Sequence, residues 1–211
     1  CSITGNTAEY GGGIDAEGNA GITLITCSIS GNSAGSGGGM SIQGSSTVYV
    51  TTCTIHDNTA GLGGGIFLGV GGTLHAQNCI ISRNSVENAK SCWPVWCTNT
   101  QGGGMYIYGR SSVIITTCIL TTCTINDNAA YIGGGIFVSV RSGTLETDDC
   151  SITDNIAARD VHGSGLYAED GTVLLGNGTS FRNNTIHVGR AVVVYVLPVP
   201  AGHYINARRC E

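Results

Sequence analysis

Apolar residues alternate with polar residues in short runs along the whole chain. In runs such as 48–50, 53–55 and 66–68 every second side chain is apolar, and the corner at 51–52 shifts the parity between the first two runs. Alternation with a period of two is typical of strands that bury one face. The frequent Ile, Val and Thr residues also favour strands. The pattern therefore predicts three short strands per segment, joined by corners.

The same pattern recurs every 26 residues. Cys1, Cys27, Cys53 and Cys79 are evenly spaced, an asparagine follows each by five residues, and a glycine triplet follows the first three asparagines by another five. The unit reads C-x-I-x-x-N-x-A-x-x-G-G-G-[IM]. An insertion and a duplication, TTCIL then TTCTI, interrupt the later copies, but the register survives to a seventh copy. One unit cannot bury its apolar side chains alone, so the repeat predicts a solenoid of stacked units.

We therefore predict an all-β fold, a parallel β-helix of about seven coils that forms a single domain over residues 1–211. The segment 88–101, which contains CWPVWC, is predicted to be an inserted loop. The tail 192–211 is predicted to be irregular and to cap the stack, because Pro198 and Pro200 stop strand pairing. The chain opens directly on a repeat cysteine, so we expect a segment of a longer chain or of a fibre.

The repeated asparagines are expected to form a ladder at one corner of the stack. Asparagine tolerates the left-handed backbone region, and its side chain bonds to the backbone or to the amide of the coil above. Each glycine triplet marks a further bend without room for Cβ atoms. A nucleotide-binding loop is disfavoured because each triplet leads into strand residues and not into a helix. The predicted ladder consists of Asn6, Asn32, Asn58, Asn84, Asn128, Asn155 and Asn184.

The cysteines divide into two groups. The first occupies the repeated position and is expected to be a column of small buried thiols, because parallel Cβ vectors make bridges between coils awkward. It consists of Cys1, Cys27, Cys53, Cys79, Cys123 and Cys150, with Cys118 as the alternative to Cys123. The second group lies in the insertion, where Cys92 and Cys97 are candidates for a loop-closing disulfide, and Cys118 could instead capture either of them. No histidine pair has zinc-ligand spacing, and we expect no metal and no cofactor.

Composition excludes several partners. Only 11% of the residues are charged, the net charge is -5, and no run of Lys and Arg occurs, which argues against nucleic acid. No apolar run approaches the ~18 residues of a membrane span. Two sequons, at Asn177 and Asn183, are candidate sites for covalent glycans.

The repeats CSISGNSAGSGGGM and CTIHDNTAGLGGGI resemble those of chlamydial polymorphic outer-membrane proteins. That family is marked by a G-G-A-[ILV] tetrapeptide and an F-x-x-N motif; FRNN at 181–184 matches the second, and the GGGI and GGGM triplets stand for the first. Similar repeats occur in surface and flagellar-hair proteins of algae and other protists. The resemblance implies a right-handed parallel β-helix displayed outside the cell, which acts in adhesion or as a structural filament.

The favoured function is that of a non-catalytic extracellular structural protein at the cell surface, a segment of a filament or array that associates with itself or with neighbouring subunits. One alternative is an adhesin that binds a host, matrix or glycan ligand, with Trp93 and Trp96 of the insertion as its contact loop. The other is a polysaccharide-active β-helix enzyme, which would need converging carboxylates. Only Asp127 and Asp154 are expected to stack, while Asp57 is expected to pair with Arg83, so we expect no enzymatic activity.

Overall fold

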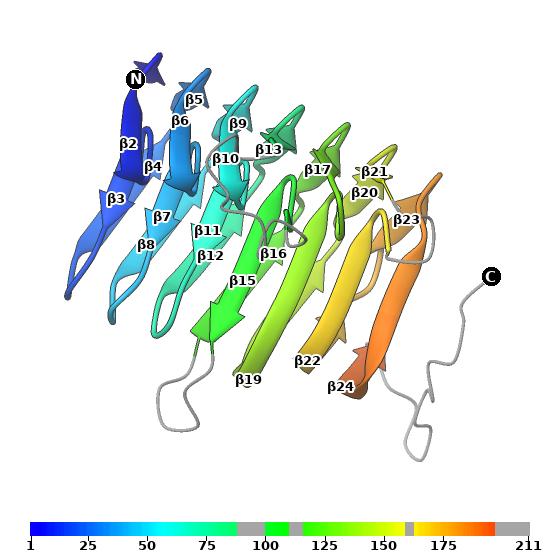
Figure 1. Ribbon diagram of the computed structural model, residues 1–211. Coiled ribbons are helices and arrows are strands. Elements are labelled where there is room, and N and C mark those ends of the chain that lie inside the picture. The colour runs from blue at the N-terminus through cyan, green and yellow to red at the C-terminus, as the bar shows by residue number, and fades with distance from the viewer. Residues whose placement is uncertain (88–99, 110–115, 159–162, 197–211) are drawn as a thin grey trace, which may run out of the picture.

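The computed structural model describes residues 1–87, 100–109, 116–158 and 163–196, and all regular structure in these ranges is β-strand. The strands of successive coils lie side by side, from the N-terminal coil in blue to the last described coil in orange (Figure 1). Equivalent strands pair in parallel, coil after coil, and build three sheets.

The first sheet contains the strand that follows each repeated cysteine. Equivalent residues pair directly, so that Ile3 lies beside Ile29 and Ile29 beside Ile55. The sequence period is therefore the structural period. The seven strands are β1 (Ser2–Thr4), β5 (Ser28–Ser30), β9 (Thr54–His56), β13 (Ile80–Ser82), β17 (Thr124–Asn126), β20 (Ser151–Thr153) and β23 (Ser180–Arg182).

The second sheet follows each asparagine, and the alternation pattern did not predict it. Its strands carry small residues, as in TAGL, so the apolar signal is weak. Its six strands are β2 (Thr7–Tyr10), β6 (Ser33–Ser36), β10 (Thr59–Leu62), β14 (Ser85–Val86), β18 (Ala129–Ala130) and β21 (Ile156–Ala157).

The third sheet follows each glycine triplet and contains two strands from each early coil. The predicted strands at 48–50 and 66–68 both belong to it, so they do not form separate sides. One row is β3 (Ile14–Ala16), β7 (Met40–Ile42), β11 (Ile66–Leu68) and β15 (Met105–Gly109), and the other is β4 (Gly21–Ile25), β8 (Thr47–Thr51), β12 (Thr73–Gln77) and β16 (Thr116–Thr121). Both rows join in the longer strands β19 (Ile136–Asp148), β22 (Leu166–Leu175) and β24 (Ile186–Val196).

The pairing shows how the stack absorbs the irregular repeats. Thr73 follows Ile66 by seven residues. Their partners in the next coil are Met105 for Ile66 and Thr117 for Thr73, and these are twelve residues apart. The next coil therefore has five extra residues between the start of β15 and Thr117 of β16. Cys123 therefore occupies the repeated position. Cys118 lies within β16, beside Leu74 of β12.

Two segment boundaries differ from those expected. Gln101 bridges Leu62 and Ile132, so the solenoid already resumes at the end of the predicted insertion 88–101. Strand β24 pairs with β22 as far as Val196, so the start of the tail predicted to be irregular is a strand. An apolar run such as AVVVYV suits a strand, and the first proline of this tail is Pro198. The segments 88–99 and 197–211 lie outside the described residues.

The core is a set of apolar columns inside the stack. The isoleucine that stands two residues after each repeated cysteine forms one such column, and from the second coil to the sixth its side chain is at most 1% exposed. Burying one such side chain contributes about 1.5–3 kcal/mol. The column consists of Ile29, Ile55, Ile81, Ile125 and Ile152. Beside it the glycine triplets stack backbone on backbone, and a Cβ on Gly39 would lie 2.7 Å from the carbonyl oxygen of Gly65.

Each corner is made by one residue with a positive φ, and at the asparagine corner this is the residue before the asparagine. Asp57, for example, has φ 55°, and its neighbour Asn58 carries the ladder. The asparagine was expected to tolerate the left-handed region, but its role is to bond inward. The column at this corner is Gly5, Gly31, Asp57, Arg83, Asp127, Asp154 and Asn183.

A second left-handed column precedes the cysteines. It consists of Thr26, Thr52, Asn78, Thr122, Asp149 and Gly178. A β-branched residue in this region is strained, because its side chain crowds the following carbonyl. The three threonines are therefore the most strained members of the column.

We predict that Thr52→Asn raises the free energy of unfolding by about 0.5–1 kcal/mol, because asparagine is tolerated at positive φ and already occupies this column at Asn78. The measurement is chemical denaturation of bacterially produced protein, which carries no N-linked glycan at the Asn-Cys-Thr sequence so created. Thr54→Asn is the control, because Thr54 lies in strand β9, where asparagine is disfavoured. Equal effects of the two changes would contradict the strain argument.

Candidate functional site

The structure brings the seven predicted asparagines into one column inside the stack, the asparagine ladder. At Asn58 the side-chain oxygen accepts hydrogen bonds from the backbone N–H and the side-chain amide of Asn32, both at 3.0 Å. The Asn58 amide donates to Asn84 Oδ1 at 3.0 Å and to the Ile29 carbonyl at 2.9 Å. All four hydrogen-bonding positions of the side chain are thus used. The same four contacts recur at Asn32, Asn84 and Asn128.

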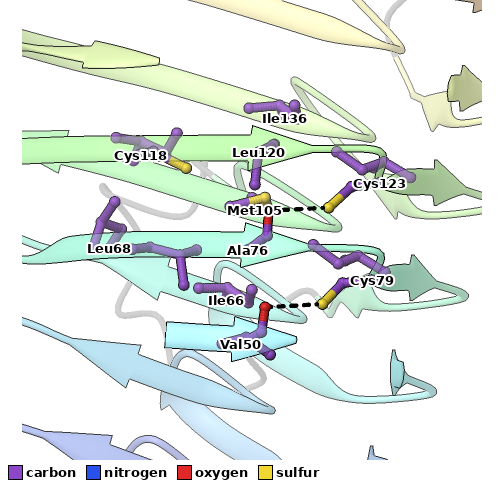
Figure 2. Close-up of a cluster of buried hydrophobic side chains, with 14 of the residues drawn as sticks. Val50, Ile66, Leu68, Ala76, Cys79, Met105, Cys118, Leu120, Cys123 and Ile136 are labelled. Atoms are coloured by element: carbon purple, nitrogen blue, oxygen red, sulfur yellow. Dashed lines mark hydrogen bonds between the residues drawn. The ribbon is translucent and has the colours of Figure 1, made fainter. Parts of the chain in front are cut away.

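The six repeated cysteines form a second column, the cysteine column, and all six are free thiols. Figure 2 shows two of them, Cys79 and Cys123, whose thiols donate to the Val50 and Ala76 carbonyls of the preceding coil, both at 3.4 Å. The sulfur also accepts a backbone N–H, as in the bond from Cys27 N to Cys53 Sγ at 3.2 Å.

In the last coil a hydroxyl group replaces the sulfur as acceptor of the backbone N–H. Thr179 stands in the cysteine position of the last coil, and its Oγ1 accepts the N–H of Cys150 at 3.4 Å. The asparagine ladder and the cysteine column therefore each provide an acceptor for a backbone N–H that points into the core.

Cys118 lies apart from the cysteine column (Figure 2). It is a free, fully buried thiol between Leu74 and Leu145 in the third sheet. Burial raises its pKa above the ordinary range of a thiol. This interior position argues against its capture by Cys92 or Cys97, which lie outside the described residues together with Trp93 and Trp96.

The polar corner is a surface cluster of His56, Asp57 and Arg83. Arg83 donates two hydrogen bonds to the Asp57 carboxylate, from Nε and Nη2, both at 2.9 Å. His56 Nδ1 lies 2.6 Å from Asp57 Oδ2. The hydrogen bonds from Arg83 and then His56 hold the pKa of Asp57 at about 2, below its ordinary value of 3.8.

Ser28 gives this corner the composition of a serine-protease triad, because its Oγ lies 3.4 Å from His56 Nε2. A working triad also needs N–H donors aimed at the developing oxyanion. Here the N–H of Ser28 donates to the Cys1 carbonyl at 2.8 Å, and that of Gly31 to the His56 carbonyl at 3.3 Å. Arg83 further occupies both oxygens of Asp57. The cluster is therefore a surface ion pair with a polar neighbour.

The stacked carboxylates Asp127 and Asp154 are each held by an amide. Asn126 Nδ2 donates to Asp127 Oδ2 at 2.6 Å, and Asn183 Nδ2 donates to Asp154 Oδ1 at 2.7 Å. Within the described ranges no three His, Cys, Asp or Glu side chains are placed to hold a metal ion. The pair is therefore not part of a larger cluster of the kind that binds calcium.

An aromatic stripe lies on the outer face of the third sheet, and the sequence analysis missed it. The rings of Phe67, Tyr106, Phe137, Tyr167 and His187 stack in that order, with centroids 5.6, 5.2, 5.1 and 4.8 Å apart. The signal was present for four of the five rings, because an aromatic residue stands four residues after Gly63, Gly102, Gly133 and Gly163. The faces of the inner rings are covered by their neighbours, so those rings offer a planar ligand or a sugar little more than their edges.

The comparisons with known proteins address the fold. A family described as "Right handed beta helix region" matches residues 1–186. The chain belongs to the right-handed β-helix family. This confirms the predicted right-handed parallel β-helix, whereas the finer resemblance to chlamydial surface proteins stays a prediction. No curated protein and no solved structure matches the chain.

Right-handed β-helices include enzymes as well as non-enzymes, so the family leaves the activity open. No helix in the described part of this β-helix is long and apolar enough to cross a membrane. Both sequon asparagines, Asn177 and Asn183, are exposed. Glycosylation at these two residues stays a prediction.

We predict that Asn58→Ala lowers the free energy of unfolding by about 3 kcal/mol or more. The change leaves the Asn32 N–H and amide, the Ile29 carbonyl and the Asn84 oxygen without this partner in the core, and each such loss costs about 1–3 kcal/mol. The measurement is denaturant unfolding, and Asn19→Ala in an exposed loop is the control. A loss no larger than that of Asn19→Ala would show that the asparagine ladder is not a stability element.

We predict that Arg83→Gln raises the pKa of Asp57 from about 2 toward 3.8, because it removes the main donor to the carboxylate. A depressed pKa contributes stability above pH 3.8 that is lost as the pH falls toward 2, so the variant should lose less stability across this window. Carbon-13 NMR titration of the Asp57 carboxyl is the measurement. Arg182→Gln on strand β23 is the control and should leave this titration unchanged.

Proposed function

We propose that this β-helix is a non-catalytic structural segment of an extracellular filament or surface array, built by stacking further coils on its ends. The support comes from the geometry of the repeat, in which each coil pairs its strands with the equivalent strands of the next coil. A strand edge is a template for another strand, so a further coil can add to the stack whether this chain or another supplies it.

The first two coils show what a stacked neighbour does for the side chains of a coil. Ile3, Ile22 and Leu24 are only partly buried, although their counterparts in the second coil, among them Ile29 and Val48, are fully buried. Asn6, the first rung of the asparagine ladder, is exposed. A further coil, whichever chain supplies it, would bury this apolar surface at about 25 cal/mol per Å² and continue the ladder.

Two general properties favour an open filament over a closed oligomer. Stacking one end of a coil stack on the other end of a second molecule is a heterologous contact, which gives open filaments when the rotation does not close. The low charge of the chain, with 11% charged residues, also gives little electrostatic resistance to association.

The alternatives have less support among the described residues. A polysaccharide-active enzyme would need converging carboxylates, and Asp57, Asp127 and Asp154 are each held by an arginine or an amide. An adhesin would present a contact loop, and its candidates Trp93 and Trp96 lie outside the described residues. Localisation at the cell surface and partnership with neighbouring subunits belong to the same proposal.

The test uses Thr23, at the open edge of β4. Hydrogen bonds between β4 and β8 start at the Ala20 carbonyl and end at the Thr26 N–H. Bonding residues alternate along a parallel strand, so Thr23 directs its N–H and carbonyl to the open edge. Thr23→Pro removes this donor and obstructs the approach of another strand, while an edge strand tolerates proline.

We expect the purified chain to self-associate with rising concentration and Thr23→Pro to weaken that association about tenfold or more. Sedimentation velocity and electron microscopy are the measurements. Thr23→Val, which keeps the N–H and the β-branched shape, is the matched control and should associate like the unchanged chain. A chain that stays monomeric at millimolar concentration would refute the filament proposal.

A further inference from the structure

The cysteine column has a regular geometry. Each thiol from the second coil to the sixth also contacts the carbonyl two residues before it, at 3.2–3.3 Å. This common contact shows that the side chains share one orientation. In an in-register parallel stack, equivalent atoms are one strand spacing apart, so neighbouring sulfurs are ~4.8 Å apart. The contacts are made by Cys27, Cys53, Cys79, Cys123 and Cys150.

This spacing is wrong for a disulfide but right for a metal ion between two thiolates. A disulfide needs sulfurs ~2.05 Å apart, less than half the spacing, which agrees with the free thiols of the structure. A thiolate binds a d10 metal ion such as zinc at ~2.3 Å. A linear sulfur–metal–sulfur unit with bonds of that length spans ~4.6 Å and fits the gap between two rungs.

We propose that the cysteine column binds soft, two-coordinate monovalent d10 ions, of the class of Cu(I), one ion between the cysteines of neighbouring coils. Soft thiolate ligands select Cu(I), zinc or iron–sulfur clusters, and zinc takes four ligands where each gap of the column offers two. Each isolated site forms when two thiols release two protons and their sulfurs bind one ion. Along the column a thiolate bridges two ions, so a filled column carries one more thiolate than ions and one net negative charge.

The column offers a thiolate some hydrogen-bond donors, although the carbonyl beside each sulfur loses the S–H that it accepts in the free thiol. Backbone N–H groups donate to sulfur, from Cys27 to Cys53 at 3.2 Å and from Cys123 to Cys150 at 3.4 Å, and such donors stabilise a thiolate. Cys118 lies outside the cysteine column among leucines, and its raised pKa opposes loss of its proton.

The experiment compares variants of the 211-residue chain with Cys92, Cys97 and Cys210 changed to Ser, so that the cysteine column and Cys118 are the remaining thiols. Reduced protein is titrated anaerobically with Cu(I) against the chelator bathocuproine disulfonate, and bound copper per chain is counted. The six cysteines of the column form five gaps, and Cys79→Ser with Cys123→Ser removes three, which leaves those between Cys1, Cys27 and Cys53.

We expect up to five ions in the parent and at most two in the double variant, with Cys118→Ser equal to the parent. Serine keeps a hydroxyl that can accept the inward N–H as Thr179 does, and circular dichroism checks that each variant is folded. X-ray absorption of the loaded parent should show two sulfur neighbours per copper. Copper lost entirely to the chelator, three or more sulfurs per ion, or equal counts in the parent and the double variant would overturn the proposal.

Discussion

The structure depends on in-register stacking of equivalent residues at one strand spacing. Every position of the repeat becomes a column, and a residue type persists there only if it is compatible with copies of itself above and below. Asparagine meets this condition because its amide and its oxygen bind one another, as Asn58 and Asn84 show at 3.0 Å. Glycine meets it where backbones touch, and aromatic rings meet it by stacking face to face.

The same condition explains where columns vary. The left-handed corner residue points to solvent, so its column contains glycine, aspartate, arginine and asparagine, and only the backbone angle is shared. Asp57 and Arg83 make use of this freedom and form an ion pair between coils. Since exposed ion pairs contribute little stability, the polar corner tolerates variation that the asparagine ladder does not.

The sequence was sufficient to predict the repeat period, the parallel stack, the asparagine ladder and the cysteine column, because each of these features places one residue type at a fixed spacing along the chain. It was insufficient for the second sheet, whose small residues such as Ala60 carry no alternation. The sequence analysis also assigned the left-handed backbone conformation to asparagines such as Asn58 and not to the residue before them. Conformational propensity alone cannot separate the corner residue from its neighbour. The aromatic stripe was missed because alternation marks inward positions, whereas Phe67 points outward and is buried by the rings beside it.

The hydrogen bonds of the asparagine ladder all run in one sense. Each side-chain amide from Asn6 to Asn128 donates to the oxygen of the following coil, and none runs backward. Aligned amide dipoles add along the axis, as they do in an α-helix, and give the two ends opposite partial charge. At Asn184 the side-chain amide donates instead to the carbonyls of Ile152 and Arg182, so the ladder's series of amide-to-amide bonds stops before this residue. The asparagine ladder therefore gives the coil stack a direction along its axis, although every strand pairing in it is equivalent from one coil to the next.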